Sequence, residues 1–64
     1  MYKIMCMFKD SNKLEDVFCD NPSLEKAKMI AYRWIAGVYC YSADAVREVV
    51  VVDSSGNVVY RKGR

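Results

Sequence analysis

Four consecutive valines, Val49 to Val52, constrain the fold of this chain more than any other feature. Branched side chains favour extended backbone, so Arg47 to Asp53 is predicted to be a strand. Successive side chains of a strand point to opposite faces of the sheet, and this run is therefore apolar on both faces. Such a strand belongs in the middle of a sheet, where neither face is fully exposed to water.

The valine strand is followed by a turn and a returning strand. Asp53-Ser54-Ser55-Gly56-Asn57 fits a three-residue hairpin loop with Gly56 in the left-handed region, and the return strand is predicted over Val58 to Lys62. This segment is similar to the closing hairpin of many small bacterial and phage-encoded proteins. Facing residues are expected to have numbers that sum to 110: Glu48 with Lys62, Val50 with Tyr60, and Val52 with Val58.

A second hairpin is predicted at the N-terminus. Residues 2 to 9 alternate as a strand does, residues 10 to 13 are polar turn material, and Leu14 to Cys19 returns as a strand. A turn centred on Asn12-Lys13 places Cys6 opposite Cys19. A cross-strand redox pair is then an alternative to the simpler interpretation, in which all three cysteines are reduced core residues.

One helix is predicted between the hairpins. Asn21 can cap its free amides and Pro22 suits its first position, so we expect the helix to begin near Pro22. Its apolar residues fall within one arc of about 140°: Leu24, Ala27, Ile30, Ala31, Trp34, Ile35, Val38 and Tyr41. Because this arc continues to Tyr41, the helix is expected to run past Gly37. If it ends earlier, Gly37 is its C-cap.

The predicted fold class is α+β, with the element order ββαββ in a single domain over residues 1–64. A chain of 64 residues is too short for a second domain. We expect a four-stranded, mainly antiparallel sheet in the order 2-1-3-4 with the helix packed on one face. This order makes the two most apolar strands the central pair, whereas the alternative order 1-2-3-4 needs a parallel pair and a more polar central strand.

The chain offers few groups for catalysis or metal binding. It has no histidine, and the usual base for a serine or cysteine nucleophile is therefore missing. Its three cysteines lack the paired spacing of a zinc site, and its three glycines are isolated rather than grouped in a phosphate-binding loop. We therefore expect no enzymatic activity, no metal and no cofactor.

A surplus of apolar strand residues points to protein contact. One helix can cover only one face of the sheet, and the set expected against it is Ile4, Cys6, Phe8, Val17, Cys19, Val50, Val52, Val58 and Tyr60. A second apolar set is left for the opposite face: Met5, Met7, Phe18, Val49, Val51 and Val59. The reverse orientation of the last hairpin moves Val50, Val52, Val58 and Tyr60 outward and preserves the surplus. We expect a second copy of the chain or another protein to cover this face.

Nucleic-acid binding is the alternative function. Lys26, Lys28 and Arg33 lie on the expected outer face of the helix, where they could contact phosphates. The formal net charge is only +2, and Glu25 interrupts the basic stripe. Because of these two features, nucleic-acid binding is a less favoured function than binding of a protein partner.

A cytoplasmic location without membrane contact is the expectation. The longest stretch without a charged residue, Trp34 to Ala43, holds ten residues, about half of what a spanning helix needs. The apolar N-terminal run ends at Lys9, too early for a signal peptide.

Overall fold

The computed structural model describes residues 2–18, 23–40 and 42–63. Its elements are, in chain order, β1 (Tyr2–Phe8), β2 (Leu14–Phe18), α1 (Leu24–Ile35), β3 (Val46–Asp53) and β4 (Val58–Gly63). The strands form one sheet in the order β2-β1-β3-β4, and every neighbouring pair is antiparallel. The predicted α+β fold and its strand order are confirmed, and the order 1-2-3-4 is wrong.

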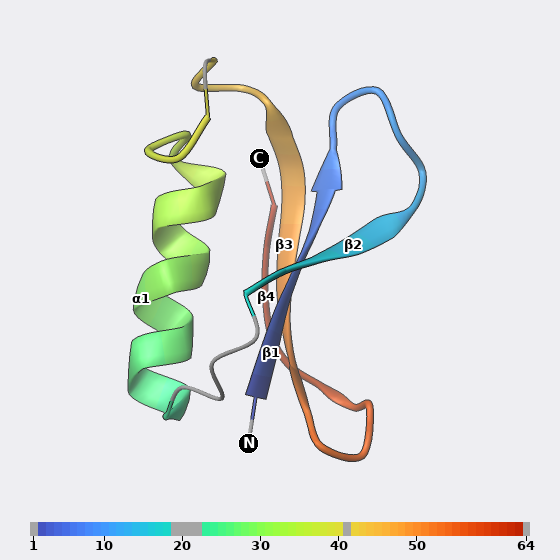
Figure 1. The fold of residues 1–64 in the computed structure, drawn as a ribbon, viewed down its shortest axis with the longest axis vertical. Helices are drawn as coiled ribbons and strands as arrows, with labels where there is room; N and C mark the ends of the chain where they lie inside the picture. Colours follow the sequence, from blue (N-terminus) through green and yellow to red (C-terminus); the bar gives the residue numbers. More distant parts are fainter. Residues whose placement is uncertain (1, 19–22, 41, 64) are drawn as a thin grey trace.

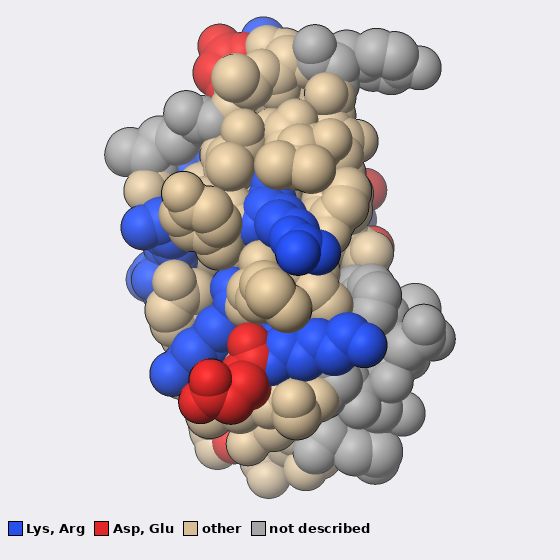
Figure 2. Space-filling model, turned by 90° about the vertical axis from the view of Figure 1, so that its left-hand side faces the viewer, with Lys and Arg blue, Asp and Glu red and all other residues tan. Residues whose placement is uncertain are grey.

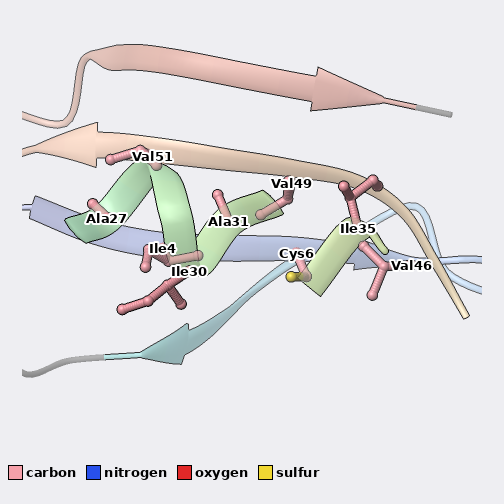
Figure 3. Packing of buried hydrophobic residues seen from close by; sticks show 9 residues of the cluster. All are labelled: Ile4, Cys6, Ala27, Ile30, Ala31, Ile35, Val46, Val49 and Val51. Carbon is pink, nitrogen blue, oxygen red and sulfur yellow. The ribbon is translucent and has the colours of Figure 1, made fainter. Parts of the chain in front are cut away.

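Helix α1 lies along one face of the sheet and packs against β1, β3 and β4 (Figure 1). The core is formed by residues from the helix and the two central strands (Figure 3): Ile4, Cys6, Ala27, Ile30, Ala31, Ile35, Val46, Val49 and Val51. Ala27 and Ala31 are fully buried. Their small side chains allow the helix backbone to approach the sheet closely, so that the larger side chains of the strands fill the space on either side.

The valine run faces the opposite way from our expectation. Val49 and Val51 lie under α1, because β1 pairs Cys6 with Val49 and Ile4 with Val51. Cross-strand partners share a face, so Val50 and Val52 belong to the other side. Four identical side chains carry no preference for one face, and the pairing with β1 decides the orientation.

Strand β4 contains an irregularity that changes its register. Val52 pairs with Val58 as predicted, but the register shifts before Val51, which pairs with Tyr60. The predicted pairs Val50–Tyr60 and Glu48–Lys62 are therefore wrong: Val50 pairs with Arg61, Val49 with Lys62, and Glu48 with Gly63. Tyr60 still faces the helix as expected, because its new partner Val51 does.

The first hairpin is shifted by four residues from the predicted register. The turn forms at Lys9-Asp10, where the Ser11 N–H donates to the Phe8 carbonyl over 3.0 Å. Cys6 consequently pairs with Glu15 and not with Cys19. The expected Cys6–Cys19 pairing is therefore wrong, and Cys19 itself lies outside the described residues.

The helix is shorter than expected at its C-terminus. It ends at Ile35, where the N–H groups of Gly37 and Val38 donate to the carbonyls of Trp34 and Arg33, each over 3.1 Å. These bonds form a Schellman motif with Gly37 in the left-handed region at φ 81°. The earlier-ending alternative is confirmed, and Val38 is 65% exposed instead of buried. Tyr41 lies outside the described residues.

The N-terminal cap of the helix is Ser23, not Asn21. The Ser23 hydroxyl oxygen accepts a hydrogen bond from the Lys26 N–H over 3.3 Å. A serine three residues before the bonded amide is a common way to satisfy the first free amides of a helix. Asn21 and Pro22 lie outside the described residues.

Replacing Gly37 by alanine is expected to destabilise the protein more than the same change at Gly56. Both glycines have positive φ, which costs an alanine about 1–2 kcal/mol. A Cβ on Gly37 would also lie 2.6 Å from the Cα of Ala43, whereas one on Gly56 would meet nothing within 4 Å. Urea unfolding measures both variants, and equal losses at the two positions would contradict the close contact with Ala43.

Candidate binding surfaces

One face of the sheet is left uncovered by the helix, and we call it the open face. Among the described elements only α1 lies outside the sheet, and it lies on the other side (Figure 1). Strand pairing assigns the following residues to the open face: Lys3, Met5, Met7, Leu14, Asp16, Glu48, Val50, Val52, Val58 and Arg61. The face is apolar along its centre and charged along its margins.

The central valines of the open face are already buried in the single chain. Val50 is 0% exposed and Val52 is 8% exposed, although no helix covers them. Val50 lies between its cross-strand partners Met5 and Arg61, whose long side chains can lie over it. The apolar surface left open is therefore smaller than expected and consists mainly of methionine, leucine and Val58, which is 47% exposed.

The six predicted anchor residues divide into groups. Met5 and Met7 lie half-buried on the open face, as the strand alternation indicates. Val49 and Val51 were placed on this face wrongly, since both are fully buried under α1. Val59 has no register partner in β3 and is exposed. The structure describes the backbone of Phe18, which pairs with Ile4, but not its side chain. Val50, Val52 and Val58 lie on the open face instead, as the reverse orientation of the hairpin predicts, but Tyr60, which that orientation also moves outward, faces the helix.

Both signs of charge flank the open face. On the β2 side, the Lys3 ammonium lies 3.6 Å from the Asp16 carboxylate. On the β4 side, the Arg61 guanidinium lies 3.4 Å from the Glu48 carboxylate. Exposed pairs of this kind add little to stability, but they place both signs of charge on the face. The Arg47 guanidinium adds one further positive charge, since it contacts the sulfur of Met7.

A shallow hollow of about 370 Å³ lies next to the β3–β4 turn. It is lined by Tyr2, Lys3, Met5, Val52, Asp53, Ser54 and Gly56. Three of these residues, Lys3, Met5 and Val52, belong to the open face. The hollow is therefore continuous with that face and can receive a side chain from a partner.

A second surface lies on the helix side, and we call it the basic face. It consists of Lys26, Lys28 and Arg33 of α1 together with Lys62 of β4. Lys62 reaches this side because it pairs with Val49, which faces the helix. The regular register predicted from the sequence pairs Lys62 with Glu48, whereas the irregularity in β4 pairs it with Val49.

Two cation–π contacts join lysines of the basic face to the aromatic rings of Tyr32 and Tyr60. The Lys28 ammonium lies 5.7 Å from the centroid of the Tyr60 ring, and the Lys62 ammonium lies 5.8 Å from that of Tyr32. Both contacts join α1 to β4: in the first the helix supplies the lysine and the strand the ring, and in the second the strand supplies the lysine and the helix the ring. Contacts of this type contribute about 0.5–1 kcal/mol at exposed sites and hold these lysines near the helix surface.

No carboxylate forms an ion pair with the basic face within the described part of the chain. The three ion pairs there involve Lys3, Lys9 and Arg61. Figure 2 shows Lys and Arg side chains spread over the helix side, with acidic atoms at few places among them. Glu25 is the only acidic residue of α1. The modest net charge of the chain is thus unevenly distributed.

The described cysteines are two free thiols, Cys6 and Cys40. Cys6 has no exposed surface, and burial, with a smaller contribution from Cys40, raises the pKa of its thiol to about 12. A thiol with so high a pKa is unreactive as a nucleophile near neutral pH. Cys6 therefore acts as a core residue.

The described residues form no constellation that indicates a cofactor or a catalytic centre. Nowhere in residues 2–18, 23–40 and 42–63 do three or more Cys, Asp or Glu side chains gather around a point where a metal could bind. None of the described helices has the length and apolarity needed to cross a bilayer. The chain matches no protein-family model, no curated protein and no solved structure to a significant degree. The two surfaces are therefore the features from which a function can be argued.

Alkaline pH is expected to destabilise the protein through Cys6. The unfolded thiol titrates near 9.0 and the folded one near 12. The stabilisation from this raised pKa is complete below pH 9 and is lost between pH 9 and 12, with a slope of up to about 1.4 kcal/mol per pH unit. In urea unfolding at a series of pH values, the advantage of the wild type over Cys6→Ala should narrow above pH 9. A constant difference from pH 7 to 11 would contradict the buried neutral thiol.

Proposed function

We propose that this protein is a non-catalytic interaction module that associates with a second copy of itself through the open face. The observation that carries the proposal is the one-sided packing of α1, which leaves an apolar strip between charged margins on the opposite side of the sheet. Surfaces with an apolar centre and a polar rim are typical of protein contacts. Two free thiols are consistent with action in the reducing cytoplasm.

The charge pattern favours a second copy as the partner. In a two-fold symmetric contact the same surface meets itself, so each charged group must find an opposite charge on the same face. The open face carries Lys3 and Asp16 on one flank and Arg61 and Glu48 on the other. Each flank therefore carries one cation and one anion. In a symmetric dimer, a flank can meet the same flank or the other flank of the second copy, and in both cases opposite charges come into contact. A face of a single sign would repel itself.

The size of the open face indicates a weak and reversible dimer. Four strands spaced about 4.8 Å apart and about six residues long cover roughly 400 Å² per copy. Twice this area is below the 1,200 Å² or so of a stable specific interface. The central valines, already buried in the single chain, contribute little further area on association. We expect dissociation in the micromolar range or above.

Lysine substitutions on the open face should abolish the dimer. The variant Met5→Lys/Val58→Lys places two positive charges at the symmetric contact, and Val58 is exposed enough to change without disturbing the core. Sedimentation velocity from 10 μM to 1 mM should show a concentration-dependent dimer for the wild type and a monomer for the variant. The control Val38→Lys adds a lysine at an exposed valine beyond the helix and should dimerise as the wild type does.

Two outcomes would reject self-association through this face. A wild type that remains monomeric at 1 mM leaves only a different protein as the partner of the open face. A double variant that dimerises as strongly as the wild type places the contact elsewhere on the molecule. Circular dichroism of each variant confirms that the sheet and helix are intact.

A further inference from the structure

The four cations of the basic face have no acidic partner among the described residues, a property that they share with Lys13 and Arg47. Within the described ranges, Lys3, Lys9 and Arg61 each lie within 4.0 Å of a carboxylate, and none of the four basic-face residues does. Arg33 instead contacts the Met29 sulfur over 3.8 Å, and Lys28 and Lys62 lie over aromatic rings. Cations without a carboxylate within ion-pair distance remain available to an external anion.

Exposed aromatic and apolar side chains lie among these cations. Tyr32 is 57% exposed and Met29 is also exposed, although both belong to a helix whose other face is in the core. Tyr32 is in contact with Lys62, and Met29 is in contact with Arg33. Positive charges next to an accessible ring are the combination with which proteins bind nucleic-acid strands, phosphates on the cations and bases on the ring.

We propose that the basic face binds single-stranded nucleic acid. Lys26, Lys28, Arg33 and Lys62 contact the phosphates, and an unpaired base stacks on the exposed face of Tyr32. The stripe is only one helix and one strand wide, with about 10 Å between Lys26 and Arg33 along the helix axis. A stripe of this width follows one backbone more readily than two. This proposal is independent of the dimer, because the open face lies on the other side of the sheet (Figure 1).

Binding to a fluorescent 12-nucleotide oligo(dT) or oligo(U), followed by anisotropy, tests the proposal. With four phosphate contacts, log K should fall against log salt with a slope of up to about −2.8, since a single strand gives about −0.7 per contact. The variant Lys26→Gln/Lys28→Gln/Arg33→Gln retains only Lys62, so its slope should fall to about −0.7 and its affinity in 50 mM salt by at least about tenfold.

A matched control separates the basic face from net charge. The variant Lys3→Gln/Lys9→Gln/Lys13→Gln also removes three positive charges, but it removes them from the β1–β2 hairpin, away from α1. It should bind the oligonucleotide within about twofold of the wild type in 150 mM salt, because charges beyond a Debye length of about 8 Å are largely screened there. Equal weakening by the two triple variants would show that binding follows overall charge, and it would overturn the assignment to this face.

Two single substitutions test the details of the face in opposite directions. Glu25→Gln removes the one acidic residue of α1 and should strengthen binding about two- to threefold with little change of salt slope. Tyr32→Leu keeps every charge and should weaken binding about fivefold or more through lost stacking. A Tyr32→Leu variant that binds as the wild type does would overturn base stacking.

The competing anions are outcomes of the same test. A 12-base-pair duplex that binds as tightly as the single strand would overturn the single-strand assignment. Binding to phosphatidylglycerol vesicles with no anisotropy change for either oligonucleotide in 50 mM salt would overturn nucleic acid altogether. Met5→Lys/Val58→Lys, which changes only the open face, should still bind the oligonucleotide, so failure of the dimer and failure of this proposal are distinguishable.

Discussion

The antiparallel pairing of β1 with β3 determines most of this structure. It sets Ile4 opposite Val51 and Cys6 opposite Val49, and so decides which half of the valine run enters the core. Residues of these two strands supply the sheet side of the core cluster, and Ala27 and Ala31 of α1 pack against it. Because strand side chains alternate, a slip of one residue in this pairing would exchange the buried and the open valines.

A single irregularity in β4 then decides which faces Arg61 and Lys62 occupy. With the shift between Val51 and Val52, Arg61 pairs with Val50 and reaches Glu48, while Lys62 pairs with Val49 and reaches Tyr32. In the regular register, Lys62 would pair with Glu48 and Arg61 would pair with Val49, so the two cations would exchange faces. One extra residue in an edge strand thus decides which of the two cations lies on the open face and which lies on the helix side. β-bulges often redirect side chains in this way.

The sequence predicts the elements and their order well because these depend on local patterns. The alternation in Tyr2–Phe8, the valine run and the apolar arc of the helix each identify an element without reference to the rest of the chain. The candidate surfaces depend on non-local choices. Identical valines give no preference between faces, and neither the β4 irregularity nor the tight turn at Lys9-Asp10 has a clear local signal. Met5 and Met7 could be placed from sequence, whereas Val49 and Val51 could not.

The open face shows how a small domain with too few helices to cover both faces of its sheet can still bury apolar strand residues from solvent. A chain of 64 residues with one helix cannot bury both faces under secondary structure. Met5 and Arg61, the cross-strand neighbours of Val50, have long flexible side chains, and Val50 is fully buried between them. The folded single chain therefore already has most of the stabilisation that this face can provide. Association through the open face, as proposed, would add a modest increment, and it would leave the basic face, on the helix side of the sheet, equally accessible in one copy or two.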